Sequence, residues 1–159
     1  MKNIKTILVP LDGSAVAEAA LAPAVELARE ASATLILMRA AEPRTLPLGD
    51  PIEDPHEVMR EAREYLAATR ARLMGAGVHS IDVSVWSGPP AEAIVRAAQS
   101  RNADLIVMSS HGRTGLARLA VGRTFERVLR TTTVPILLIP PARPQANSAS
   151  LSATEVANA

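Results

Sequence analysis

Two glycine-containing segments of the sequence have the residue types of an anion-binding site. Residues 109–115, Ser-Ser-His-Gly-Arg-Thr-Gly, follow an apolar run, and nine residues separate Gly112 from a second segment, Gly122-Arg123-Thr124. Glycines after a strand let the backbone approach a ligand closely, and amides at a helix start favour negative charge by roughly 0.3–1 kcal/mol per contact. The spacing suggests a phosphate-binding loop, although glycines also begin ordinary turns. It is not a Walker loop, because the sequence Gly-Lys-Ser/Thr is absent.

Apolar runs define the strands that would position these segments. Four runs are continuous, as in strands buried on both faces of a parallel sheet: residues 7–9, 35–38, 105–108 and 134–139. The run 105–108 is the most apolar and is expected to be central. Residues 81–86 alternate apolar and polar side chains, which predicts an edge strand.

The segments between the strands have the signals of helices. Asp12-Gly13-Ser14 turns the chain and offers Ser14 as the cap of a helix over 15–31, and Asp54-Pro55 begins a helix that continues to about Met74. Further helices are expected at 91–101 and 124–130. Five strands separated by four helices predict an α/β fold with an open, doubly wound parallel sheet and helices on both faces. Ligands of such folds bind beyond the carboxyl ends of the strands, where the strand order reverses.

The composition excludes several classes of site. The 159 residues contain no cysteine, which excludes disulfides, thiolate nucleophiles and zinc–thiolate centres. The formal net charge of +1 supplies no field for nucleic acid, and aromatic residues, at 2%, offer few stacking platforms. No apolar run approaches the roughly 18–20 residues of a membrane span, and the N-terminus does not resemble a signal peptide, so we expect a cytoplasmic protein. His56 and His79 have no partners at metal-ligand spacing, and no metal site is expected.

Three separated blocks resemble the universal stress protein family. They are residues 7–14, residues 103–115, and residues 126–130 followed by 134–137, and together the resemblance covers almost all of residues 1–140. It implies a five-stranded parallel sheet in the order 3-2-1-4-5 and a homodimer. It also implies one domain over residues 1–141, and the Pro-, Ala- and Ser-rich residues 142–159 are expected to form a flexible tail. In members that bind ATP, the nucleotide lies in the crevice between the first and fourth strands.

Carried over position by position, the resemblance implies a set of nucleotide-binding residues. Asp12 is suited to ribose hydroxyls or to the water shell of Mg²⁺, although a turn and helix-capping role also explains it. We expect the nucleoside and base to be bordered by Pro10, Leu11, Asp12 and Ala40. The loop after the fourth strand is expected to contribute Met108, Ser109, His111, Gly112 and Arg113. The helix beside the phosphates is expected to begin with Gly122, Arg123 and Thr124.

The sequence departs from the ATP-binding pattern at two positions. That pattern is Gly-x-x-Gly, nine residues, then Gly-Ser or Gly-Thr, whereas here Ser109 replaces the first glycine and Arg123 the hydroxyl residue. The missing hydroxyl removes a hydrogen bond of ~0.5–1.5 kcal/mol, while a guanidinium near phosphates supplies a charge-assisted one of ~1.5–3 kcal/mol. Arg123 can equally fill the phosphate space itself.

Two functions follow from these alternatives. The first is a dimeric stress-response and signalling protein that takes ATP, with Mg²⁺, as a regulatory ligand. The second is a nucleotide-free dimeric interaction module in which Arg123 fills the phosphate site. In both, the homodimer forms through the last strand, Val134 to Ile139, because an uncharged free edge invites pairing. An enzyme is not expected: no paired carboxylates stand near these loops, and the Ser-Gly-Gly-x-Asp-Ser loop of adenylyl-transferring relatives is absent.

Overall fold

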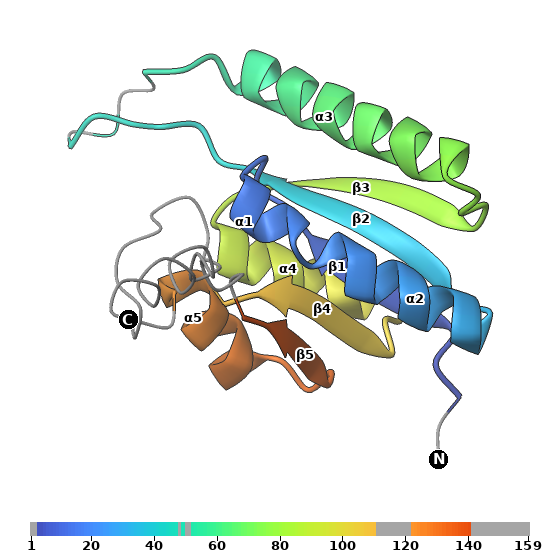
Figure 1. Cartoon of the computed structure of the whole chain (residues 1–159). Coiled ribbons are helices and arrows are strands. Elements are labelled where there is room, and N and C mark those ends of the chain that lie inside the picture. The colour runs from blue at the N-terminus through green and yellow to red at the C-terminus, as the bar shows by residue number, and fades with distance from the viewer. Residues whose placement is uncertain (1–2, 48, 50–51, 111–121, 141–159) are drawn as a thin grey trace, which may run out of the picture.

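A five-stranded parallel sheet with helices on both faces forms the body of the protein (Figure 1). The structure is a computed structural model and describes residues 3–47, 49, 52–110 and 122–140. The strands are β1 (Thr6–Pro10), β2 (Thr34–Ala41), β3 (Ile81–Ser87), β4 (Leu105–Ser109) and β5 (Ile136–Ile139). The helices are α1 (Ala15–Glu18), α2 (Leu21–Ala31), α3 (Pro55–Gly75), α4 (Pro90–Ser100) and α5 (Arg123–Thr131).

The strand order is β3-β2-β1-β4-β5, as the resemblance implied. From β1 the chain moves outward to β2 and β3, then crosses back to place β4 on the other side of β1. The register pairs Leu8 with Ile36 on one side and with Ile106 on the other. The order therefore reverses between β1 and β4, whose carboxyl ends lie at the same edge of the sheet. The apolar run 105–108 lies in the interior strand β4, and β1 occupies the middle position.

Alternate residues of the strands fill two aliphatic cores. Ile7 and Val9 of β1 pack with α1, α2 and α3, whereas Leu8 packs with α4 and α5 on the opposite face. All three side chains are fully buried. Burial of one such side chain stabilises the fold by roughly 1.5–3 kcal/mol, so the middle strand is a rigid base for the loop that follows it.

The single helix predicted over residues 15–31 is wrong in one detail, because α1 and α2 are separated at Ala19 and Ala20. Pro23 explains the break. A proline has no amide hydrogen for the carbonyl four residues earlier, here that of Ala19, and its ring clashes with that carbonyl. The predicted caps are confirmed: Ser14 Oγ accepts from Ala17 N at 3.1 Å, and Asp54 Oδ1 accepts from His56 N at 2.8 Å.

The remaining predicted elements are present with small shifts. Residues 81–87 form the edge strand β3, and β2 is longer than predicted because it pairs with β3 through Ala41. The last strand begins at Ile136 and not at Val134, since Pro135 has no amide hydrogen with which to begin the ladder, although its carbonyl accepts from Ile106 N at 2.9 Å. The predicted tail, 142–159, lies outside the described residues.

Candidate functional site

The carboxyl ends of β1 and β4 bring together the predicted loops. Leu11 N donates to Met38 O at 2.7 Å, which extends the pairing of β1 with β2 by one residue before the chain turns at Asp12. On the other side of the switch point, Ser110 N donates to Ile139 O at 3.2 Å, and Gly122 N donates to Ser110 O at 2.9 Å. The start of α5 is thus fixed against the end of β4, and both lie at the edge where the Asp12 turn emerges.

The turn after β1, residues 12–14, is closed by its own side chains. Asp12 Oδ1 accepts from Ser14 N at 2.8 Å and from Ser14 Oγ at 2.6 Å, while Ser14 Oγ accepts from Ala17 N. Gly13 has a φ of +86°, a conformation that favours glycine. The turn role of Asp12 is therefore confirmed, and its partly exposed carboxylate lies at the sheet edge expected for a ligand.

The residues expected on the β4 side are tightly packed. Met108 is 6% exposed, Ser109 7% and Ser110 6%. Ser109 ends β4 in register with Ile139, so the side chain that replaces the family's first glycine is accommodated inside the protein. His111, Gly112 and Arg113 lie outside the described residues.

The start of α5 differs from the start of α1, because Gly122 caps the helix and has no side chain to accept from the first amides. Its φ of −61° and ψ of 143° are ordinary cap geometry. Arg123 is exposed and Thr124 partly exposed. The first turn also carries Glu126, whose carboxylate pairs with Arg130 at 2.8 Å. The amides of this turn have the positive end of the helix dipole behind them.

Ala40, the residue expected to face the base, lies opposite Trp86 in the register of β2 and β3. Both pack against the core beneath α4. Trp86 Nε1 donates to Ser84 Oγ at 2.8 Å, and the Arg96 guanidinium lies 5.3 Å from the Trp86 ring centroid. The single tryptophan of the chain thus lies beside the expected base position and serves as a fluorescent reporter of it.

Sequence reasoning missed two residues next to the turn after β1. Arg39 of β2 lies against Gly13, and its guanidinium lies 5.0 Å from the ring centroid of Tyr65 on α3. A signal was present, because Arg39 interrupts the apolar strand with its only charge. The contact with Tyr65 depends on how α3 packs, which a local pattern does not reveal.

The sequence pattern of the Universal stress protein family matches residues 3–140. The chain belongs to this family. A universal stress protein of Thermus aquaticus, encoded beside a QAH/OAS sulfhydrylase, is 36% identical over 136 residues, which are 85% of this chain and 98% of that protein. Among solved structures, UspA of Lactobacillus plantarum is similar with a TM-score of 0.72 and 27% identity, over 87% of this chain and 99% of that one.

A second solved universal stress protein is in complex with cAMP. It is similar to this chain with a TM-score of 0.69 and 22% identity, over 89% of this chain and all (100%) of that chain. At this identity the likeness is one of fold. Within the residues that the structure describes, no three His, Asp or Glu side chains gather as a metal site, and no helix is long and apolar enough to cross a membrane.

Proposed function

We propose that this universal stress protein is a cytoplasmic dimer that binds ATP as a regulatory ligand between the ends of β1 and β4. The observation that carries the proposal is the meeting of two distant segments at one sheet edge. The Asp12 turn follows β1, and the hydrogen bond from Gly122 N to Ser110 O holds the start of α5 against the end of the neighbouring strand. Open α/β sheets bind ligands at this kind of reversal in strand order.

The residues at this edge fit the parts of a nucleotide. Asp12 supplies a carboxylate for ribose hydroxyls, and the chain at Pro10 and Leu11 borders the nucleoside. Ala40 leaves room for a base because its side chain is small. The triphosphate, when bound, brings a concentrated negative charge and a Mg²⁺ ion. Gly122 and the amides of Arg123 and Thr124 would face that charge at the positive end of the helix dipole.

The family supports the same ligand class. Family resemblance implies ATP in the crevice between the first and fourth strands, and the cAMP complex supports only that this fold can hold an adenine nucleotide. The proposal assigns binding and no chemical step. Asp12 and Ser14 hydrogen-bond to each other and begin α1, which is a structural use of both groups.

A calorimetric titration with ATP and Mg²⁺ tests the proposal, with Trp86 fluorescence as a second readout. We expect saturable binding with one nucleotide per chain. An absence of saturable binding up to millimolar ATP would overturn the proposal.

Arg123→Ser separates the ATP-binding protein from the nucleotide-free module. If the guanidinium contacts phosphates, the variant loses a charge-assisted hydrogen bond and gains a weaker neutral one, so affinity falls about fivefold to tenfold. The matched control is Arg130→Ser, which removes an exposed arginine from the last turn of the same helix. A gain of affinity in Arg123→Ser would instead show that Arg123 occupies the phosphate space.

The proposed dimer is inferred from the apolar character of the β5 edge. Residues 136–139 are all aliphatic, and Leu137 is 37% exposed. The opposite edge strand, β3, carries Asp82, which pairs with Arg101, and a charge of this kind discourages edge pairing. Pairing of two β5 edges about a twofold axis would satisfy the backbone groups on the side of β5 that faces away from β4.

Leu137→Lys places a charge on the proposed dimer edge, and light scattering should then show a monomer at micromolar concentration. Val83→Lys is the matched control, because Val83 is 36% exposed on the other edge strand. A dimer that survives Leu137→Lys, or one lost in Val83→Lys alone, would contradict pairing through β5.

A further inference from the structure

Arg39 packs on the turn after β1 from the side of α3. A Cβ placed on Gly13 would lie 3.4 Å from Arg39 Nη1 and 3.7 Å from both Cζ and Nη2. Three nearly equal distances mean that the guanidinium presents its flat face to the glycine. The same guanidinium lies 5.0 Å from the centroid of the Tyr65 ring, within the range of a cation–π contact. Arg39 therefore contacts both the turn and α3.

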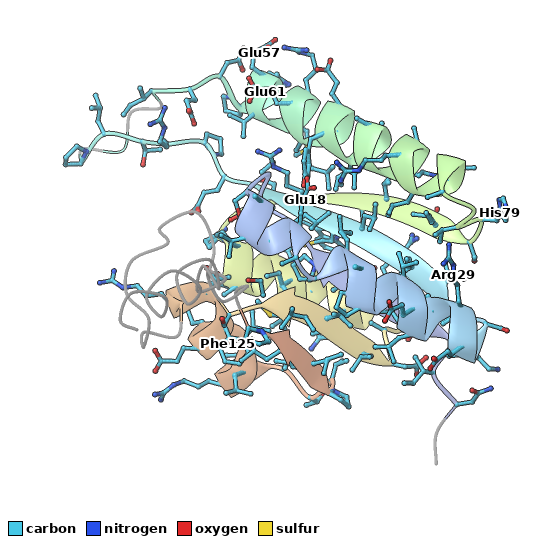
Figure 2. The ribbon with its side chains drawn as sticks, in the orientation of Figure 1. Glu18, Arg29, Glu57, Glu61, His79 and Phe125 are labelled. Carbon is cyan, nitrogen blue, oxygen red and sulfur yellow. The ribbon has the colours of Figure 1, made fainter. Side chains whose placement is uncertain are left out.

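Glu18 joins α1 to the same part of α3. Tyr65 Oη donates to Glu18 Oε1 at 2.8 Å, and Arg72 Nη2 donates to Glu18 Oε2 at 2.8 Å. Figure 2 shows Glu18 on the side of α1 that faces α3. We call Arg39, Tyr65, Glu18 and Arg72 the α3 clamp. It holds the start and the end of the segment from Gly13 to Glu18.

This segment needs an external support. The bonds between Asp12 and Ser14 fix the internal shape of the turn, but they do not fix its position relative to the sheet. The following helix, α1, has only four residues, too few to be stable alone. Gly13 adds backbone freedom. The position of the Asp12 carboxylate at the sheet edge therefore depends on contacts with neighbouring elements.

Burial and the Glu18 carboxylate together strengthen the hold of Tyr65 on its proton. Burial raises the pKa of Tyr65 to about 12, and the hydrogen bond to the Glu18 carboxylate adds to the rise. The positive charge of Arg39 and a hydrogen bond with Thr69 act in the opposite direction on the same pKa. Tyr65 thus remains a neutral donor to Glu18 at a pH at which an exposed tyrosine, with a pKa of about 10, has lost its proton.

We propose that Arg39 is a positioning residue for the ligand: its guanidinium fixes the turn that carries Asp12 against α3, so that nucleotide affinity depends on the α3 clamp. This inference rests on the proposed function. It assigns Arg39 no contact with the nucleotide. It also predicts that α3, which lies outside the switch point, responds when the site is filled.

Three substitutions test how Arg39 acts. Arg39→Met keeps the length of the side chain but removes its charge and planar group, and we expect ATP to bind about tenfold more weakly. Arg39→Lys keeps the charge alone and should weaken binding to within about twofold of Arg39→Met, because a lysine cannot lie flat on Gly13. Full affinity in Arg39→Lys would show that Arg39 acts on the ligand through charge, which contradicts positioning.

The matched control is Arg60→Met, since Arg60 is an exposed arginine of α3 that pairs with Glu57 and Glu64. Figure 2 shows Glu57 near the start of α3. We expect ATP affinity within about twofold of the unchanged protein. An equal loss in Arg60→Met and Arg39→Met would indicate a general effect of charge and overturn the assignment.

A spectroscopic readout separates positioning from plain stabilisation. Tyr65 is the only tyrosine of the chain, so the NMR band of a carbon-13-labelled tyrosine ring and the tyrosinate absorbance report on the clamp without overlap from Trp86. Saturating ATP should change the tyrosine band in the unchanged protein and leave it unaffected in Arg39→Met. If the tyrosine band of the unchanged protein stays the same while ATP is bound, the coupling is contradicted.

Ligand-free protein distinguishes failure of this inference from failure of the proposed function. If calorimetry shows no ATP binding, the proposed function fails and the coupling fails with it, but the clamp is still tested. The tyrosinate midpoint of folded protein should lie near pH 12, move up in Arg39→Met and move down in Glu18→Gln. A midpoint at the ordinary value of about 10 that is also unchanged in Glu18→Gln would show that the hydrogen bond from Tyr65 to Glu18 is absent in solution.

Discussion

The two chain segments that meet at the switch point are built differently. The turn after β1 is closed by side chains, since Asp12 and Ser14 bond to each other and Ser14 caps α1. The start of α5 has Gly122 as its cap and is held to Ser110 through a backbone hydrogen bond. The first segment thus presents a fixed carboxylate, and the second presents backbone amides at a helix terminus. The difference suggests that one side of the site recognises hydroxyl groups by position and the other recognises negative charge.

Removing the side-chain hydrogen bonds of the turn after β1 should have the largest effect on stability and on ATP affinity. Asp12→Ala leaves Ser14 N and Oγ without this acceptor, which should lower the free energy of unfolding by ~1–3 kcal/mol and ATP affinity by more than tenfold. Chemical denaturation and calorimetry measure the two quantities. Asp12→Asn is the control, because its amide oxygen still accepts from Ser14 and should recover most of the stability. Unchanged ATP affinity in Asp12→Ala would remove this turn from the site.

Adding a side-chain cap at the start of α5 should have a smaller effect, with opposite signs for the free energy of unfolding and for ATP affinity. Gly122→Ser fits the observed φ and ψ, and its hydroxyl would accept from the amides of the first turn. We expect a gain of a few tenths of a kcal/mol in stability, about 0.3, and a loss of ATP affinity of about threefold. The control is Thr132→Ser, at the C-terminal cap of α5. It is preferred to Ser110→Gly because Ser110 is buried. A gain in both quantities would show that ligand and cap do not compete for these amides.

The smallest expected effect is on the pH dependence of stability, through Tyr65 of the α3 clamp. The pKa of Tyr65 is raised in the folded protein to about 12, whereas an unfolded chain releases the same proton near pH 10. The folded state therefore holds the proton more tightly, and its stability falls as the pH rises from about 10 to 12. Partial exposure of Tyr65 keeps this effect small. Denaturation at a series of pH values should show a flatter decline in Tyr65→Phe, and an identical decline would contradict the raised pKa.

The sequence predicts the frame of the site better than its contacts. Continuous apolar runs identify the parallel strands because strands buried on both faces have no polar side, and the caps at Ser14 and Asp54 depend on neighbouring residues alone. Pro23 is a local signal for the break before α2, which the prediction of a single helix missed. By contrast, the bond from Gly122 to Ser110 and the packing of Arg39 on Gly13 join residues far apart in sequence. Such contacts are set by how strands and helices pack, and the local pattern contains no record of them.

Nucleotide binding between β1 and β4 requires that one ligand use both segments. An amide NMR titration of the full chain with ATP and Mg²⁺ tests this use residue by residue. The signals of Asp12 and Gly13 and those of Gly122 to Thr124 should shift together, with one saturation curve. Shifts confined to one of the two segments, or no saturable shift in either, would contradict a nucleotide site between β1 and β4.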